Sequence, residues 1–229
     1  MRRHKGFLFI GVVMNKIREN SLYLVISEEC GKGRSAAEIA GYAISGGVDI
    51  IQMREKDRPR EELVKMGSGL SRLCKKGGVT FIVNDDPLLA EETCADGVHL
   101  GQEDITKHPI KEARKILGPD RIIGVSTHSL DQFDKANAQD VDYIAFGPVF
   151  YTKTKDYFIG TGDVKNVLKA ASKPVFFIGG INLSNIDELL AKGAKNIALI
   201  RGVTESCDII SRVKEFKEKL GTQKGGDAA

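Results

Sequence analysis

Residues 147–155 of the chain directly follow a strand-like apolar run at residues 143–146. The run ends abruptly in Gly-Pro, and residues 152–155 then supply two threonine hydroxyls and two lysine ammonium groups. Hydroxyl and ammonium donors crowded at the carboxyl end of a buried strand suit a phosphate or a pyrophosphate. The alternative is a solvated basic loop, and the residues that follow the other apolar runs bear on that choice.

A second polar cluster ends the apolar run near residue 52, where Gln52, Arg54 and Lys56 occupy alternate positions. Side chains along a strand point to opposite faces in turn, so these three share one side and Met53 and Glu55 share the other. A guanidinium offers a planar fork of donors and an ammonium a compact charge, a combination that suits phosphate oxygens. The alternative is an ion-pair network with nearby acidic residues.

Acidic residues follow the third and fourth apolar runs. Asn84 and Asp85 end the third run, and Asp104 lies shortly after the fourth. Carboxylates that face a basic cluster suggest a bridged Mg²⁺, which takes one or two carboxylates, keeps waters and shares phosphate oxygens. We expect Asp86 to cap a helix instead. Asp104 has the same alternative, because a helix is expected after it.

The fifth apolar run leads into Ser126 and His128. Ser126 can donate a hydrogen bond into a site at the strand ends, and no acid at an obvious spacing makes it a triad nucleophile. His128 is either an acid–base group or a capping residue.

Glycine-rich turns follow the last two apolar runs, in the sequences Gly179-Gly180-Ile181 and Ile200-Arg201-Gly202. In a (β/α)8 barrel the loops after strands 7 and 8 form a phosphate site from accessible backbone N–H groups. Ordinary turn glycines are the alternative. The chain therefore predicts two anion sites, one fit for Mg-pyrophosphate and one for a phosphate monoester. Two phosphorylated substrates, one of which loses pyrophosphate, follow as a hypothesis.

Short apolar runs alternate with helical patterns along the chain, and this alternation would position the polar clusters. The runs are apolar throughout, as parallel strands buried on both faces are. The predicted strands are residues 22–26, 49–53, 80–83, 97–100, 122–125, 143–146, 175–178 and 197–200. The predicted helices are residues 36–44, 60–76, 87–92, 110–117, 130–138, 164–171, 184–192 and 207–219.

Eight strand-then-helix units predict an α/β fold with a single (β/α)8 TIM barrel and a site at the carboxyl ends of the strands. A doubly wound open sheet is the alternative. It is weakened because no G-x-G-x-x-G follows the first strand. Ser35, Ser129 and Ser184 stand where helix N-caps are expected.

The 229 residues suit one α/β domain. A net charge of +3, from 34 basic and 31 acidic side chains, is too mild to indicate a nucleic-acid partner. The cysteines at 30, 74, 94 and 207 form no C-x-x-C motif. We therefore expect reduced thiols in a cytoplasmic protein.

The first twenty residues are expected to form an N-terminal extension. Residues 1–13 resemble the start of a signal peptide, but no small-residue cleavage site follows, and Met14 is a second candidate for the first residue. The apolar run 7–13 is too short to span a bilayer, so no membrane partner is expected. The catalytic barrel is predicted over residues 21–220, and residues 221–229 as a disordered tail. The oligomeric state stays open.

Taken in order, these residues resemble the thiamine-phosphate synthase family, over about residues 22 to 203. Each matching motif is moderately specific, and the ordered set is highly specific. The motifs are residues 52–56 (QMREK), 83–85 (VND), 96–104 (DGVHLGQED), 124–128 (GVSTH), 147–155 (GPVFYTKTK) and 179–181 (GGI).

The resemblance implies a Mg²⁺-dependent transferase acting on two small molecules. It implies that 4-amino-5-hydroxymethyl-2-methylpyrimidine diphosphate and 4-methyl-5-(2-hydroxyethyl)thiazole phosphate are joined, which gives thiamine phosphate and pyrophosphate. The bond to pyrophosphate would break first, and the thiazole nitrogen would attack the resulting pyrimidinylmethyl cation.

The resemblance also implies roles for individual residues. Mg²⁺ would be held by Asp85 and Asp104. The pyrophosphate would be bound by Gln52, Arg54, Lys56, Asn84 and Lys155. Ser126 would line the pyrimidine and leaving-group region, and the catalytic residues would be Arg54, Lys56, Ser126 and Lys155. The thiazole phosphate would be bound by Thr152, Thr154, Gly180 and the backbone at Ile200 and Arg201.

Three places depart from the family pattern. Tyr151 replaces a frequent proline, Arg201 replaces a small hydroxyl residue, and Tyr157-Phe158 make the loop after Lys155 bulkier. The side chain of Arg201 either contacts the thiazole phosphate or turns outward.

A related thiazole tautomerase, which uses a histidine at the position of His128, is the nearest alternative function. A non-catalytic sensor of thiamine precursors is another, and a phosphate-handling barrel of tryptophan biosynthesis a third. The acidic and basic clusters together favour the synthase.

Overall fold

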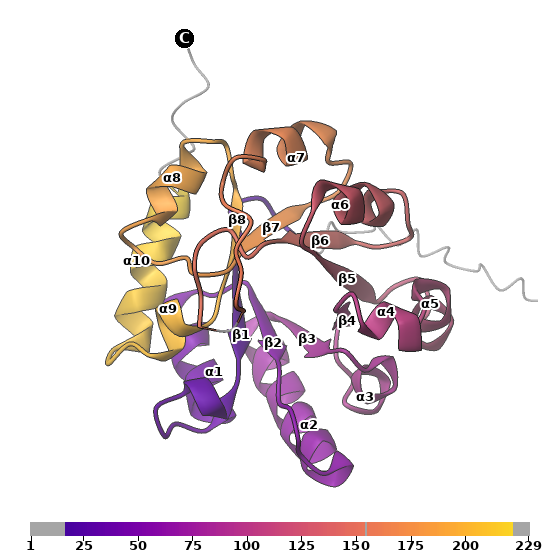
Figure 1. Cartoon of the computed structure of the whole chain (residues 1–229). Helices are drawn as coiled ribbons and strands as arrows, with labels where there is room; N and C mark the ends of the chain where they lie inside the picture. Colours follow the sequence, from indigo (N-terminus) through magenta and orange to yellow (C-terminus); the bar gives the residue numbers. More distant parts are fainter. Residues whose placement is uncertain (1–16, 154, 222–229) are drawn as a thin grey trace, which may run out of the picture.

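The computed structural model describes residues 17–153 and 155–221 (Figure 1). Most of the expected extension, residues 222–229 of the expected tail, and Thr154 lie outside the described residues. Gly221, the first residue of that predicted tail, is the last residue of a helix. No helix within the described ranges is long and apolar enough to cross a membrane.

Eight parallel strands close into a barrel in chain order, with β1 hydrogen-bonded to β8. The predicted (β/α)8 barrel is confirmed, and the pairing of the first strand with the last excludes the open sheet. The strands are β1 (Leu22–Ile26), β2 (Ile50–Met53), β3 (Thr80–Asn84), β4 (Gly97–Leu100), β5 (Ile122–Thr127), β6 (Tyr143–Phe146), β7 (Val175–Ile178) and β8 (Asn196–Leu199).

Helices surround the barrel and connect successive strands (Figure 1). Three one-turn elements were not predicted, because a single turn carries no helical periodicity: η1, α4 and α9. The helices are η1 (Glu28–Cys30), α1 (Ala36–Gly46), α2 (Arg60–Gly77), α3 (Pro87–Glu92), α4 (Asp104–Lys107), α5 (Ile110–Leu117), α6 (Leu130–Asn137), α7 (Val164–Ala170), α8 (Ile186–Leu190), α9 (Arg201–Thr204) and α10 (Ile209–Gly221).

Two of the three predicted N-caps are confirmed. The Ser35 side chain accepts a hydrogen bond from the backbone N–H of the third residue of α1, and Ser129 does the same for α6. The prediction for Ser184 was wrong, because α8 begins at Ile186 after Asn185. Ser184 instead donates its hydroxyl to Asn182 Oδ1 at 2.5 Å, within the turn before the helix.

The core has two layers, set by the alternation of side chains along each strand. Phe177 of β7 points outward and packs edge-on against Phe146, with ring centroids 6.2 Å apart. Phe176, its neighbour, points into the barrel and packs against two tyrosines, Tyr23 and Tyr143. The barrel interior is therefore filled by side chains, and Ile17 belongs to this inner layer.

Four residues, which we call the strand clasps, fasten the amino-terminal end of the barrel. Each begins an even-numbered strand or precedes it by one residue, and its side-chain oxygen accepts a backbone N–H at the start of a neighbouring strand. The pairs are Asp49 with Leu22 (2.7 Å), Asp96 with Phe81 (2.8 Å), Asp142 with Ile123 (2.7 Å) and Asn196 with Ser21 (3.1 Å). The clasps lie at the end of the strands opposite to the predicted site.

Candidate functional site

A cavity of about 500 Å³ opens at the carboxyl ends of the strands, and each of the eight strands or its following segment contributes to the wall. Most of the residues predicted for the site lie there. They are Gln52, Arg54, Lys56, Asn84, Asp85, Asp104, Ser126, Thr152, Lys155, Ile200 and Arg201. Thr154 lies outside the described residues.

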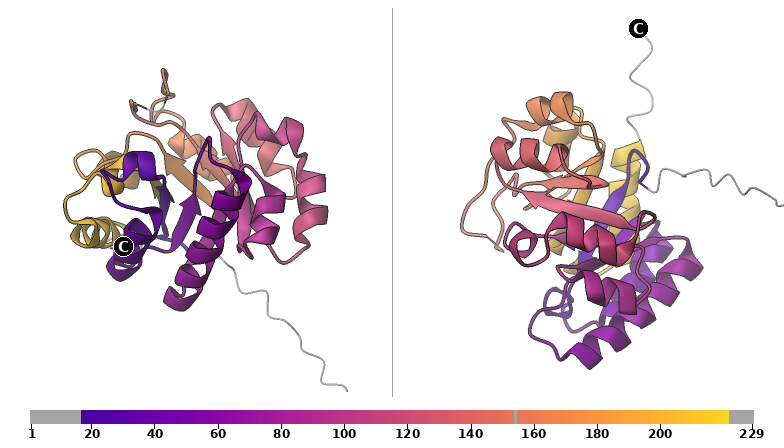
Figure 2. Two further views of the ribbon diagram at one scale, coloured as in Figure 1. Left: turned by 90° about the horizontal axis from the view of Figure 1, so that it is seen from below. Right: turned by 90° about the vertical axis from the view of Figure 1, so that its right-hand side faces the viewer.

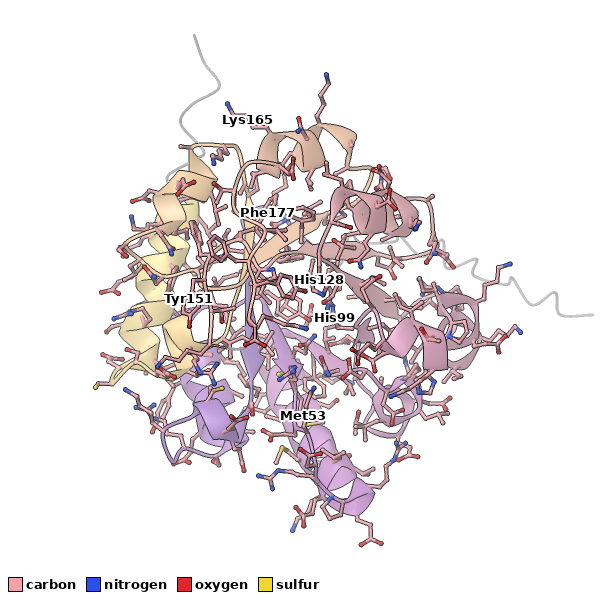
Figure 3. The ribbon with its side chains drawn as sticks, in the orientation of Figure 1. Met53, His99, His128, Tyr151, Lys165 and Phe177 are labelled. Carbon is pink, nitrogen blue, oxygen red and sulfur yellow. The ribbon has the colours of Figure 1, made fainter. Side chains whose placement is uncertain are left out.

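The basic part of the wall comes from β2 and the segment after it. Gln52, Arg54 and Lys56 line the cavity, as the alternation of side chains predicts. Met53 is 2 % exposed and lies on the outer side of β2 (Figure 3). Within residues 17–153 and 155–221, neither Arg54 nor Lys56 forms an ion pair, so their charges face the cavity.

Glu55, the acidic neighbour of these cations, points away from the cavity. Its carboxylate accepts the backbone N–H of Glu28 at 2.7 Å and pairs with Arg58 at 3.5 Å. The ion-pair network considered for this segment therefore exists, but on the outer face and with Arg58.

Asp85 and Asp104 lie together on the acidic part of the wall. Burial raises the pKa of Asp85 to about 6, and the hydrogen bond and charge of Asp104 act in the same direction. Arg54 and Lys56 oppose this pKa rise through their charges. Gly101 leaves room for the pair, since a Cβ there would lie 2.7 Å from Asp104 Oδ2.

The neighbouring acid, Asp86, caps α3 as predicted, because its side chain accepts the backbone N–H of Leu89 at 2.9 Å. Asp104 is the first residue of α4 and does not occupy the cap position, which is held by Glu103. Its carboxylate is therefore directed to the cavity rather than used as an N-cap.

The paired carboxylates fit Mg²⁺ better than a cation that needs an all-protein cage. In the part of the chain that the structure describes, no group of three or more His, Cys, Asp or Glu is placed to hold a metal ion. Mg²⁺ needs only one or two carboxylates when waters and phosphate oxygens complete its coordination. A divalent cation bound to both carboxylates would also relieve the repulsion between them when both are ionised.

The segment that follows β6 crosses the end of β7 and then reaches the cavity. Val149 and Phe150 donate backbone hydrogen bonds to Ile178 and Gly179, at 2.9 and 3.1 Å. Gly147 permits this approach, because a Cβ there would lie 2.1 Å from the Ile178 oxygen. The connection extends from the barrel in Figure 2.

This segment is not simply a solvated basic loop. Thr152 and Lys155 form an isolated antiparallel bridge, and both line the cavity. Both lysines are exposed, but Lys153, which lies between the bridged residues in sequence, does not line the cavity. The two lysines therefore have different surroundings.

His128 lines the cavity beside this segment and lies close to His99 in Figure 3. Its Nδ1 donates to the Gly147 carbonyl oxygen at 2.5 Å, and its ring meets Tyr157 edge-on, with centroids 6.1 Å apart. The N-cap of α6 is Ser129, so His128 is not the capping residue.

At the glycine-rich end, Gly179, Ile181 and Ile200 line the cavity, whereas Gly180 is not among the lining residues. Gly180 has a positive φ of 65°, and a Cβ there would lie 2.2 Å from the Tyr151 oxygen. Arg201 lines the cavity and also pairs with Glu205 of its own helix at 3.1 Å.

A buried hydrogen-bonded chain, which sequence reasoning missed, runs through the barrel interior below the cavity. Gln52 Nε2 donates to the Tyr23 hydroxyl (3.0 Å), which contacts the Tyr143 hydroxyl (2.8 Å). Tyr143 contacts His99 Nδ1 (2.8 Å), and His99 Nε2 contacts Ser126 Oγ (2.8 Å). We call these five residues the buried relay.

Burial lowers the pKa of His99 to about 4 and raises the pKa of Tyr23 well above its ordinary range. The relay is therefore uncharged at neutral pH. Its sequence signal was the presence of polar residues at inward positions of strands. Gly124 on β5 makes space for it, because a Cβ there would lie 1.9 Å from the Tyr143 ring.

Comparison with known proteins identifies the family of the chain. The family model described as thiamine monophosphate synthase matches residues 22–203. A thiamine-phosphate synthase of Persephonella marina is 38 % identical over 202 residues, which cover 87 % of this chain and 93 % of that protein. One of Moorella thermoacetica is 36 % identical over 207 residues, covering 89 % of this chain and 97 % of that protein.

Among solved structures, the thiamine phosphate pyrophosphorylase from Pyrococcus furiosus superposes with a TM-score of 0.82 at 32 % identity. The match covers 92 % of this chain and 98 % of the archaeal chain. Sequence motifs, fold and relatives coincide over nearly the whole barrel. The chain therefore belongs to the thiamine monophosphate synthase family of transferases.

Proposed function

We propose that this protein joins 4-amino-5-hydroxymethyl-2-methylpyrimidine diphosphate to 4-methyl-5-(2-hydroxyethyl)thiazole phosphate, releasing thiamine phosphate and pyrophosphate with Mg²⁺ as cofactor. The observation that carries the proposal is one cavity whose wall holds both a group of cations and a pair of carboxylates. Arg54, Lys56 and Lys155 supply the cations, and Asp85 and Asp104 the carboxylates.

In this proposal the basic wall binds the pyrophosphate and stabilises it as it departs. Negative charge on the leaving group grows as the C–O bond breaks, and fixed cations favour that charged state over the ground state. Gln52 and Asn84 add amide donors to the same region. Held by Asp85 and Asp104, Mg²⁺ would supply further positive charge at the pyrophosphate oxygens.

The thiazole phosphate would bind at the glycine-rich end, near Thr152 and the backbone at Ile200 and Arg201. The resemblance adds Thr154 and Gly180 to this set, although Gly180 does not line the cavity. An uncharged ring nitrogen is the nucleophile, so the reaction needs no strong general base. A cavity of about 500 Å³ is within the usual range for small-molecule sites. Holding both substrates in one cavity lowers the entropic barrier to their reaction.

The same arrangement argues against the alternative functions. A thiazole tautomerase would use His128 and has no evident need for a carboxylate pair and three cations around one cavity. A non-catalytic sensor needs no preorganised charge at a leaving group. A barrel of tryptophan biosynthesis would leave the Asp85–Asp104 pair unexplained.

A coupling assay tests the proposal. Purified protein is incubated with both substrates and Mg²⁺, and thiamine phosphate and pyrophosphate are quantified with and without a chelator. We expect both products in equal amounts, with formation abolished by the chelator and restored by excess Mg²⁺. Folded protein that binds both substrates without releasing pyrophosphate would support the sensor. Proton exchange on a thiazole carboxylate, with no coupling, would support the tautomerase.

A further inference from the structure

The buried relay connects two points of the cavity wall through the barrel interior. It begins at Gln52 on β2 and returns to the cavity at Ser126 on β5. Tyr23 and Tyr143, which lie between them, are buried and do not line the cavity. All five side chains come from different strands, so the barrel geometry itself fixes their order.

The hydrogen bonds of the relay have one direction. An amide nitrogen only donates and a phenol carries a single hydrogen. Gln52 Nε2 donates to the Tyr23 oxygen, and among the described residues the other partner of this buried hydroxyl is Tyr143, so the Tyr23 hydrogen is directed to Tyr143. The Tyr143 hydrogen is then directed to Nδ1 of His99, which must act as an acceptor.

The direction continues through the imidazole. Nδ1 of His99 accepts the Tyr143 hydrogen and so carries none of its own, which leaves the imidazole neutral with one protonated nitrogen. With Nδ1 accepting, the hydrogen is on Nε2 and is donated to Ser126 Oγ at 2.8 Å. Among the described residues, Ser126 Oγ has no other hydrogen-bond partner, so its own hydrogen is directed to the cavity.

We propose that Tyr23, Tyr143 and His99 are positioning residues that hold the Ser126 hydroxyl as a hydrogen-bond donor toward the bound substrate. The inference rests on the proposed function only for the identity of the acceptor, an anionic oxygen of the departing pyrophosphate. Because Ser126 Oγ accepts the hydrogen of His99 Nε2, its own hydrogen is not used on that nitrogen and is left for the substrate.

The opposite direction would defeat this purpose. It requires the Gln52 amide to turn, so that its oxygen accepts from Tyr23, and every hydrogen of the relay to reverse. Ser126 would then donate to His99 Nε2 and present only lone pairs to the cavity. Lone pairs repel an anionic oxygen, so the two directions predict opposite effects of Ser126 on the leaving group.

The tautomer of His99 tests the direction without any substrate. Multiple-bond ¹⁵N–¹H correlations are recorded on ligand-free protein labelled with ¹⁵N-histidine. Single substitutions to Gln at His4, His108 and His128 assign the other signals. We expect one neutral tautomer of His99 at neutral pH, with hydrogen on Nε2. Hydrogen on Nδ1, or exchange between the tautomers, would overturn the proposal even if the coupling assay succeeds.

Kinetics then test whether Tyr143 acts through Ser126. Tyr143→Phe removes only the hydroxyl and keeps the ring that packs against Phe176 at 5.4 Å. Loss of one preorganised donor lowers kcat by about 10²-fold, so we expect that loss for Ser126→Ala and about tenfold for Tyr143→Phe, with both KM values unchanged.

The double variant is decisive. If Tyr143 works only by orienting Ser126, adding Tyr143→Phe to Ser126→Ala causes no further loss of kcat. Multiplied losses would show that Tyr143 acts independently and would overturn its positioning role. Tyr42→Phe, on the exposed face of α1, is the control and is expected to retain full activity. If Tyr143→Phe does not fold, the tautomer of the unsubstituted protein still decides.

Discussion

Asp85 is the residue whose surroundings conflict most with its charge. It is half-buried, shares a hydrogen bond with Asp104, and has a left-handed backbone with φ of 66°. Its backbone N–H donates to the His99 carbonyl oxygen at 2.8 Å, which fixes this conformation. A residue held in such a state contributes to function more than to stability.

We therefore expect Asp85→Asn to stabilise the metal-free protein at alkaline pH. The pKa of Asp85 is about 6 in the folded chain and 3.8 ordinarily, so folding binds its proton more tightly. Ionisation thus lowers the free energy of unfolding above pH 6, and the loss disappears toward pH 3.8. After discounting for solvent exposure, about 1 kcal/mol and 2–4 °C in Tm are expected at about pH 8.

Thermal unfolding in chelator, followed at several pH values, measures this effect. The gain in Tm should shrink as the pH falls below 6. Asp120→Asn, at an exposed position, is the control and should show no such trend. An equal gain at every pH would mean that the carboxylate of Asp85 is not destabilised by its neighbours.

Lys155 offers a second test at this scale, because Lys153 provides a matched control two residues away. Lys155→Met removes a cation from the cavity wall and should lower kcat by about 10²-fold, with a smaller change in KM for the thiazole phosphate. Lys153→Met, which removes an exposed charge, should leave kcat nearly unchanged. The opposite split between kcat and KM would assign Lys155 to the thiazole-phosphate end.

Sequence reasoning reached these lysines and carboxylates because each follows an apolar run, where its position can be read locally. The buried relay could not be predicted in this way, because its residues are far apart in sequence. Tyr23 and Tyr143 are 120 residues apart in sequence, and His99 and Tyr143 are 44 apart. Only the closed barrel brings their hydroxyl and imidazole groups together.

Among the structural elements, the strand clasps determine how the strands begin. The three aspartate clasps also donate their own backbone N–H to the same neighbouring strand. Asp96, for example, donates to the Phe81 carbonyl oxygen at 2.8 Å. Side chain and backbone of one residue thus bind both polar groups of another. This fixes the strand register at the end of the barrel away from the cavity.

Replacing a clasp should lower stability without lowering activity. Asp96→Ala leaves the N–H of Phe81 without its carboxylate acceptor, and we expect a loss of about 1–2 kcal/mol in the free energy of unfolding. Urea unfolding measures the loss, and kcat should be unchanged because Asp96 lies at the opposite end from the cavity. Asp120→Ala serves as the control. A large fall in kcat at unchanged stability would refute this division of roles.

Elements with several turns or a full apolar run were predictable, and short ones were not. The strand β5 was predicted to end at Val125 but continues to Thr127, so Ser126 lies on the strand itself. Ser126 and Thr127 are polar, so the apolar run that predicts a strand stops before them. Likewise α4 and α9 form at the cavity edge, where tertiary contacts outweigh the local pattern.

At the scale of the whole molecule, the reactivity of the four cysteine thiols tests how the helices pack against the barrel. Cys30 and Cys74 are buried, and Cys94 and Cys207 are exposed, all four without disulfides. Burial raises the pKa of Cys74 to about 12 and also raises the pKa of Cys30. Since the thiolate is the reactive form, the buried pair should react slowly.

Titration of the folded protein with a chromogenic disulfide reagent should therefore label two thiols rapidly, and titration in denaturant all four. Cys94→Ser and Cys207→Ser should each remove one rapid equivalent. Rapid reaction of all four in the absence of denaturant would contradict the packing of α2 and η1 against the barrel.

The closure of the barrel has one more consequence. The ladder between β8 and β1 and the bond from Ser21 to Asn196 join the first strand to the last, and Lys217 of α10 donates to the Asn20 carbonyl at 3.2 Å. The eight strand-and-helix units are consecutive in sequence, but in space they form a closed ring. A circularly permuted chain, opened in the turn after Gly118 and rejoined between α10 and β1, would keep every strand beside its present neighbours.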